Sequence, residues 1–179
     1  MFYISEVKKT PPVAFKTALH EMVYTTLQQF GVPYERVEND EAITMEDCIL
    51  IDQQLKMKTV KTLFLCNRQQ TAFYLLVTTA DKPFITKDFS SAMEISRVSF
   101  APADLLLSML GTVVGAATIY GILLDKENKV QVVIDQDVLA EEWYGCSDST
   151  TTGYMKVPTN WIMNDFLRFA AHTPKFIQL

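Results

Sequence analysis

The sequence predicts a mixed α+β fold, in which strands and helices follow one another without strict alternation. Runs rich in β-branched and aromatic residues recur along the chain, and they are separated by segments with apolar residues at helical spacing. The lack of a regular βαβ order favours a mixed sheet over a doubly wound parallel one. The chain has 179 residues and no Ser/Gly-rich linker, repeat or low-complexity run, so we expect one domain over residues 1–179.

The first three elements are predicted to be a helix, a short strand and a second helix. Pro11-Pro12 can occupy a first helical turn, and apolar residues recur at helical spacing up to Gly31, which stands at a C-terminal cap position. The strand is Tyr34–Glu38. Thr44 begins a segment that resembles a capping box and opens a helix to about Leu55. The apolar face of the first helix indicates that it packs on the domain, although residues 1–19 could also extend it.

A hairpin and a short apolar helix are predicted in the middle of the chain. Lys61–Cys66 and Ala72–Thr79 are β-rich runs joined by five polar residues, which is typical of a hairpin. Pro102–Leu110 is an apolar helix that Gly111 terminates. A loop of small residues follows this helix.

The last part of the chain is predicted to contain three strands and one helix. Lys129–Asp135 and Tyr154–Val157 are β-rich, Trp161–Ala171 has helical spacing, and Lys175–Leu179 is a final strand.

The composition limits the classes of function. A formal charge of −5 argues against tight nonspecific binding of nucleic acid, although a local basic patch can still meet a tRNA end. Three scattered cysteines without a C-x-x-C pair indicate free thiols, and two distant histidines are too few for a convincing zinc site. No apolar run reaches the ~20 residues of a membrane span. We therefore expect a soluble, cytoplasmic protein without a metal centre.

Several stretches, in the right order from about residue 20 onward, resemble the prolyl-tRNA editing family of the YbaK/ProX type, and in particular its stand-alone PrdX-like branch. For example, the segment from Lys61 is similar to the family pattern K-N-L-F-L-x-(N/D). The matching stretches are Phe30–Val37, Ala42–Cys48, Lys61–Gln69, Phe73–Leu76, Asp81–Phe84, Ser96–Ala101, Leu110–Gly115, Tyr120–Ile122, Val130–Asp137 and Gly145–Thr152.

This resemblance implies a curved, partly open mixed β-barrel flanked by helices. It also implies hydrolysis of mischarged aminoacyl-tRNA, with alanyl-tRNA(Pro) as the expected substrate, without a metal or organic cofactor. The implied partners are the acceptor end of the tRNA and prolyl-tRNA synthetase. A catalytically degenerate paralogue that binds an amino acid, a tRNA end or a protein is the alternative. The sequence says nothing about the oligomeric state.

The resemblance assigns a catalytic role to Lys61, which aligns with the lysine of the family. Its ammonium group could hold the terminal phosphate or ribose of the tRNA, or orient the ester. A plain surface lysine at a strand end is the alternative. Thr62 stands where the family has asparagine and is a substrate-binding candidate, as is Thr44 in the motif before the second helix. Lys56, Lys58, Lys61 and Arg68 could form a basic contact surface for tRNA, or be scattered solvated side chains.

The loop after Gly111 corresponds to the G-x-x-P-G loop of the family, with Val114 in place of proline. Gly111 and Gly115 are expected to let the backbone approach the substrate and stabilise negative charge on the reacting carbonyl, with Gly115 as a catalytic candidate and Gly111 and Val114 as substrate-binding candidates. An ordinary glycine-rich turn is the alternative. The other candidates for the compact pocket of this loop are Ala116, Thr118 and Tyr120.

A hydroxyl-rich run after Cys146 corresponds to the family's G-C-H-P-x-x-N-T. Ser147 takes the histidine position and is a catalytic candidate, and Thr151 takes the asparagine position as a substrate-binding candidate. Asp148 could contact the ammonium group of the substrate. A solvated loop with internal side-chain caps is the alternative. No histidine accompanies Cys146, so we expect a buried structural thiol.

Overall fold

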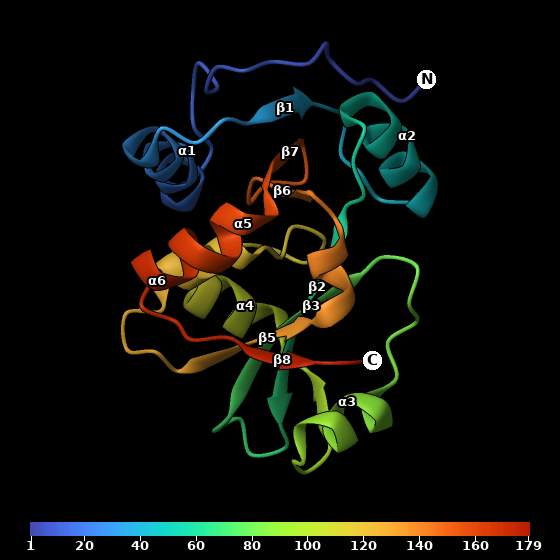
Figure 1. Cartoon of the computed structure of the whole chain (residues 1–179), viewed down its shortest axis with the longest axis vertical. Coiled ribbons are helices and arrows are strands. Elements are labelled where there is room, and N and C mark those ends of the chain that lie inside the picture. The colour runs from blue at the N-terminus through green and yellow to red at the C-terminus, as the bar shows by residue number, and fades with distance from the viewer.

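The computed structural model describes all 179 residues and contains two sheets with helices around them (Figure 1). The smaller sheet has the strand order β1-β7-β6, and the larger one has the order β4-β2-β3-β5-β8. A parallel bridge between Thr59 and Gly145 joins the two sheets. A side chain at position 145 would not fit, because its Cβ atom would lie 2.8 Å from the sulfur of Met57 and 2.9 Å from the carbonyl oxygen of Lys58.

The elements follow one another in mixed order along the chain. The α-helices are α1 (Ala18–Phe30), α2 (Met45–Leu55), α3 (Thr86–Met93), α4 (Ala103–Leu110), α5 (Thr159–Trp161) and α6 (Leu167–Phe169). The 3₁₀-helices η1 (Ile119–Leu124) and η2 (Gln136–Ala140) and the π-helix η3 (Ile162–Phe166) complete the helical segments. The strands are β1 (Glu35–Glu38), β2 (Val60–Asn67), β3 (Phe73–Thr79), β4 (Val98–Phe100), β5 (Val130–Asp135), β6 (Trp143–Ser147), β7 (Gly153–Pro158) and β8 (Lys175–Ile177).

The larger sheet is mixed, as predicted. β2 pairs antiparallel with β3 and β4, whereas β5 pairs parallel with β3 and β8. The smaller sheet is antiparallel throughout. The prediction of a mixed α+β fold with flanking helices is therefore confirmed.

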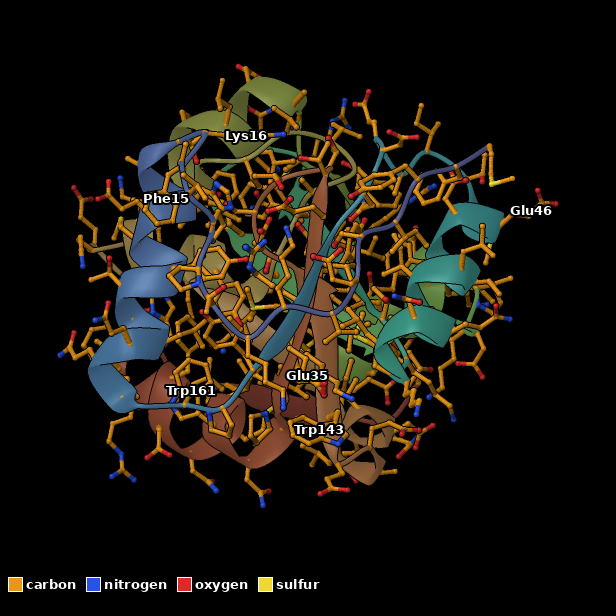
Figure 2. The ribbon with its side chains drawn as sticks, turned by 90° about the horizontal axis from the view of Figure 1, so that it is seen from above. Phe15, Lys16, Glu35, Glu46, Trp143 and Trp161 are labelled. Atoms are coloured by element: carbon orange, nitrogen blue, oxygen red, sulfur yellow. The ribbon has the colours of Figure 1, made fainter.

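The two sheets enclose the main hydrophobic core, a cluster of 25 buried residues that includes Phe64, Tyr120, Tyr144 and Phe166. A second cluster lies between the larger sheet and α3. A third cluster lies under α2, where Ile51 contributes to it. Figure 2 shows α1 and α2 on opposite sides of the smaller sheet. No helix of the chain is long and apolar enough to span a membrane.

The prediction that the first helix begins near Pro11 is wrong. The helix begins after Thr17, whose side chain accepts the N–H of His20 at 3.0 Å. Residues 4–8 lie beside β1 and Asn39 through bonds such as Lys8 N–H to the Arg36 carbonyl at 2.8 Å. The cap at Thr17, and not the two prolines, therefore marks the start of the helix.

Local cap signals are predicted correctly elsewhere. Gly31 and Gly111 end α1 and α4 with left-handed φ angles of 64° and 68°. At the start of α2, Thr44 accepts the N–H of Asp47 and the Asp47 carboxylate accepts the N–H of Thr44, which is a complete capping box. The final helix is present but contains a π-helical turn. The sequence reasoning missed α3, β4 and β6.

Candidate active site

A cavity of about 280 Å³ lies where α2, the start of β2, the loop after α4 and strands β6 and β7 meet. None of the side chains around it is charged at neutral pH. Its lining residues are Cys48, Thr59, Val60, Thr62, Leu63, Gly115, Ala117, Cys146, Ser147 and Tyr154. Three of them, Thr62, Gly115 and Ser147, are among the site residues predicted from the sequence. The structure therefore brings together parts of three motifs that are far apart in the chain.

The loop after α4 carries backbone N–H groups without a protein acceptor beside this cavity. Gly115 has a φ angle of 93°, in the left-handed region that favours glycine. The N–H of Ala116 is bonded to the carbonyl of Val113 at 3.0 Å, whereas the N–H groups of Gly115 and Ala117 have no acceptor within the protein. Both of these residues line the cavity. Such free backbone donors are suited to stabilise an oxyanion.

The structure does not place Lys61 on the wall of this cavity. Successive side chains of a strand point to opposite faces, so Lys61 lies on the other face of β2 from Thr62. Its ammonium group donates to the carbonyl oxygen of Lys82, which leaves two of its N–H donors free. The Lys82 ammonium in turn contacts Asp135 at 2.8 Å and Asp137 at 2.6 Å.

Other predicted substrate-binding residues serve as caps or core. Thr44 caps α2, and Gly111 caps α4 at a point where a Cβ atom would lie 2.3 Å from a methyl group of Leu124. Thr118 is buried and caps η1. Tyr120 is also buried, and its hydroxyl lies 3.3 Å from the sulfur of Met155.

Val114 and Ala116 flank the cavity-lining glycine without lining the cavity themselves. The side chain of Val114 is 72% exposed, so it does not plug the cavity. Ala116 is fully buried behind the loop.

The Ser147 hydroxyl is engaged within its own loop. It donates to the carbonyl oxygen of Thr150 at 2.8 Å and accepts the N–H of Ser149 at 3.0 Å. The carbonyl of Thr151 accepts the N–H of Ala42 at 3.1 Å, which ties this loop to the segment before α2. Because the Ser147 hydroxyl donates its proton to a carbonyl oxygen, it stabilises the loop and is not available to attack an ester.

Asp148 is buried, and protein donors occupy both of its oxygens. One oxygen accepts from His20 at 3.0 Å and Tyr24 at 2.8 Å, and the other accepts from the hydroxyl and the N–H of Thr150. Burial alone would raise the pKa of Asp148, but the hydrogen bonds from His20, Thr150 and Tyr24 together lower it below its ordinary value. The carboxylate is therefore a structural anion without a free oxygen for a substrate ammonium.

Cys146 is a buried free thiol. Burial raises its pKa to about 12, and the nearby charge of Asp148 adds to this effect. The thiol is therefore protonated at neutral pH and is not a nucleophile, as the sequence indicated.

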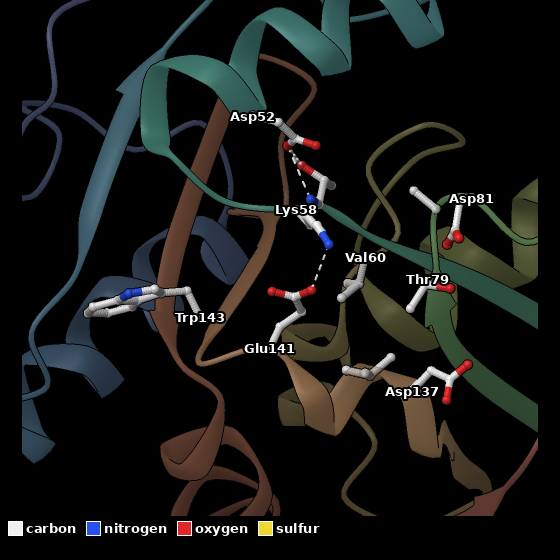
Figure 3. A pocket seen from close by; sticks show the side chains of 11 residues that line it. Asp52, Lys58, Val60, Thr79, Asp81, Asp137, Glu141 and Trp143 are labelled. Carbon is white, nitrogen blue, oxygen red and sulfur yellow. Dashed lines mark hydrogen bonds and ion pairs between the residues drawn. The ribbon is translucent and has the colours of Figure 1, made fainter.

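A larger cavity of about 400 Å³ adjoins the first and shares Thr59 and Val60 with it. Figure 3 shows Asp52 and Trp143 at its sides and the ion pair between Lys58 and Glu141, 2.9 Å long, across it. Burial raises the pKa of Asp52, against the effect of its hydrogen bonds from Thr59. The carboxylates of Asp81 and Asp137 also line this cavity.

Two members of the predicted basic surface already have partners within the protein, and a third lies beyond the far end of β2. Lys58 is paired with Glu141, and Lys61 contacts a carbonyl oxygen. Arg68 lies beyond the far end of β2, roughly 20 Å away at about 3.3 Å per strand residue.

The sequence did not indicate most of the other residues that line the uncharged cavity of about 280 Å³. Val60 could have been found, because it lies two residues before Thr62 and so shares its face of the strand. Cys48 and Tyr154 come from other elements, and no local signal marks them.

Comparisons with known proteins identify the family of the chain. Residues 41–161 match the aminoacyl-tRNA editing domain family. The prolyl-tRNA editing protein ProX of Acetoanaerobium sticklandii is 29% identical over 119 residues, which cover 66% of this chain and 73% of that protein.

Two solved structures share the fold across nearly their whole length. One is described as a candidate trans-editing enzyme for prolyl-tRNA synthetase, with a TM-score of 0.62 and 11% identity over 92% of this chain and 99% of the other. The second comes from work on the computational grafting of epitopes onto scaffold proteins, with a TM-score of 0.64 and 12% identity over 92% and 99% of the two chains. The family match spans well over half of the sequence and includes every residue that lines the uncharged cavity. The chain therefore belongs to the aminoacyl-tRNA editing domain family.

Proposed function

We propose that this protein hydrolyses mischarged aminoacyl-tRNA in trans, with alanyl-tRNA(Pro) as its substrate. The observation that carries the proposal is the uncharged cavity of about 280 Å³ formed by residues of three family motifs. A wall without charged side chains suits an aminoacyl group with a small, uncharged side chain. Family membership and the likeness to ProX support the same reaction.

The proposed reaction is direct attack of water on the aminoacyl ester: the carbonyl carbon gains the water oxygen, its bond to the ribose oxygen breaks, one water proton ends on that ribose oxygen, and the free amino acid leaves as a carboxylate that releases the other proton to solvent. Neither Cys146 nor Ser147 is available as a nucleophile, because the thiol is protonated and the hydroxyl donates to a carbonyl. Negative charge develops on the carbonyl oxygen as water adds, and the free N–H groups of Gly115 and Ala117 would stabilise it. The hydroxyl of Thr62, which also lines the cavity, would orient the ester or the water.

Lys61 would act from outside the cavity. Its two free N–H donors suit the terminal phosphate or the ribose of the tRNA better than the reacting carbonyl, because the ammonium is anchored at Lys82 on the other face of the strand. Ser147 would act by holding its loop. In this arrangement, prolyl-tRNA synthetase would supply the mischarged tRNA.

The test is single-turnover deacylation of a panel of aminoacyl-tRNAs that includes alanyl-, seryl-, cysteinyl- and prolyl-tRNA(Pro). Ala117→Leu should fill the cavity and slow the hydrolysis of alanyl-tRNA(Pro) by about a hundredfold or more, because a small misplacement of the ester is costly. Val114→Leu is the matched control: it adds a methylene to the same loop at an exposed position and should leave the rate unchanged. Failure of the parent protein to release any amino acid would overturn the proposal. Binding of tRNA without hydrolysis would indicate a binding module instead.

A further inference from the structure

The hydroxyl of Thr112 bridges the two loops that wall the candidate site. Thr112 is 3% exposed and lines no part of the cavity itself. Its Oγ1 atom lies 3.1 Å from the carbonyl oxygen of Ala116, in its own loop, and 3.0 Å from that of Ser149, in the opposite loop. The Thr112 hydroxyl thus donates to a carbonyl oxygen in each of the two loops.

Ser149 is held in an unfavourable backbone conformation at this bridge. Its φ angle is 85°, in the left-handed region that a residue with a side chain rarely adopts. The residue is buried, its N–H donates to the Ser147 hydroxyl, and its carbonyl accepts from Thr112. Strained conformations persist only where the surroundings fix them, and here hydrogen bonds fix the backbone on both sides.

The loop that contains Ser149 lies between two other segments of the site, the loop after α4 and the segment that precedes α2, and is hydrogen-bonded to both. On its other side, the carbonyl of Thr151 accepts the N–H of Ala42, and the carbonyl of Thr152 accepts the N–H of Asn39 at 3.0 Å. These two residues precede α2, which contributes Cys48 to the cavity. Hydrogen bonds therefore connect the Gly115 wall to the α2 wall through the loop that contains Ser149.

We propose that Thr112 is a positioning residue of the editing site, whose hydroxyl sets the width of the cavity and so decides which aminoacyl groups fit. The inference rests on the proposed function. Without the hydroxyl, the Ser149 carbonyl has no donor, the strained peptide relaxes, and the two loops separate. The free N–H groups of Gly115 and Ala117 then no longer face the ester carbonyl at one fixed distance.

The test compares Thr112→Val, which keeps the branched shape and removes the hydroxyl, with Thr112→Ser, which keeps the hydroxyl. Thr26→Val is the matched control, because Thr26 is also buried and its hydroxyl donates to a backbone carbonyl, that of Met22 at 2.7 Å, inside α1. Two quantities are measured. The first is amide hydrogen exchange in residues 113–118 and 147–152. The second is the single-turnover rate with alanyl-tRNA(Pro) and with tRNA(Pro) carrying a larger amino acid.

Thr112→Val should accelerate exchange in both loops and lower the rate with alanyl-tRNA(Pro) by about tenfold, as expected for a misplaced ester. It should also narrow the preference for alanine over the larger amino acid. Thr112→Ser should keep the amide exchange and the deacylation rates of the parent protein, and Thr26→Val should change neither of them. The inference is overturned if the parent protein is active and Thr112→Val shows the same amide exchange in the two loops and the same preference between the two aminoacyl-tRNAs. If the parent protein hydrolyses no aminoacyl-tRNA, the proposed function fails, and unaltered loop exchange in Thr112→Val would separately refute the bridge.

Discussion

The Nε2 atom of His20 lies 3.0 Å from a carboxylate oxygen of Asp148, and both side chains are almost completely buried. The other ring nitrogen of His20 lies 3.1 Å from the backbone N of Lys16 and accepts its N–H. Since a nitrogen that accepts a hydrogen bond carries no proton, the proton of this imidazole is on Nε2 and points at Asp148. Helix α1, outside the matched family segment, is thereby fixed to the loop that contains Ser147.

We expect Asp148→Asn to lower the free energy of unfolding at pH 7 by about 3 kcal/mol, because all four groups around this carboxylate are donors. The folded-state pKa of Asp148 is lowered, so its stabilising contribution is complete above the ordinary value of about 3.9 and declines as the pH falls through the folded-state pKa. The difference between parent and variant should therefore shrink below pH 4. Denaturant unfolding from pH 3 to 7 measures it, and a difference independent of pH would contradict the assignment.

Asp125→Asn is a matched comparison for that experiment. Asp125 is also buried and lies 2.8 Å from a histidine, His172, but it lines neither of the two cavities at the site. The Asp125→Asn variant should lower the free energy of unfolding by a similar amount. Only Asp148→Asn should increase amide exchange in residues 147–152.

Ser149→Gly should stabilise the protein by about 0.5–1 kcal/mol, because it relieves the strain of a positive φ angle at some cost in unfolded-chain entropy. It also removes a buried hydroxyl that has no hydrogen-bond partner. Ser149→Ala removes the same hydroxyl and keeps the strain, so it should gain less. Thermal unfolding of the two variants separates these effects, and equal stability of both would show that the backbone at this position is unstrained.

Of the three cysteines, Cys48 should be the one that a thiol reagent modifies in the folded protein. Its side chain is half-buried at the cavity, whereas Cys66 and Cys146 are buried. Burial, with the nearby Asp52 and Asp47, raises the pKa of Cys48, so the labelling should be slow at pH 7 and faster at pH 9. Labelling should also block deacylation, and Cys48→Ser should make the activity resistant to the reagent. Mass spectrometry that finds Cys146 labelled first would contradict the described burial.

Lys61→Ala should lower kcat/KM for alanyl-tRNA(Pro) by about tenfold at low salt and reduce the salt dependence by about one charge, as expected for a lost phosphate contact. Lys58→Ala is the control, because the Lys58 side chain is 77% exposed and already paired with Glu141. A Lys61→Ala protein with the parent's rate and salt dependence would remove this lysine from the site.

Local signals in the sequence predicted those features whose cause is itself local. The capping box at Thr44 and the glycine caps at positions 31 and 111 were predicted correctly, because their partners lie within one helical turn. The start of α1 was predicted at Pro11-Pro12, whereas the helix starts after the cap residue Thr17. Strand alternation puts Lys61 and Thr62 on opposite faces of β2, but it does not decide which residues line the cavity, because Leu63, on the face of Lys61, also lines it.

The polar site residues show what the sequence could not supply. Ser147 lines the cavity, but its hydroxyl donates to the carbonyl of Thr150, a contact that no family position indicates. Asp148 was interpreted as a contact for the substrate ammonium, whereas donors from α1, more than 120 residues away, use its oxygens. These contacts depend on how segments that are distant in the sequence pack together, and a sequence motif carries no information about that packing.

The parallel bridge between Thr59 and Gly145 places the pocket at the seam between two sheets. Thr59 and Cys146, next to that glycine, both contribute to the pocket wall. Any side chain larger than hydrogen at position 145 would wedge against the backbone of Lys58 and force the sheets apart. Because the same glycine lies at the joint of the two sheets and next to the pocket wall, a single added methyl group would disturb both at once.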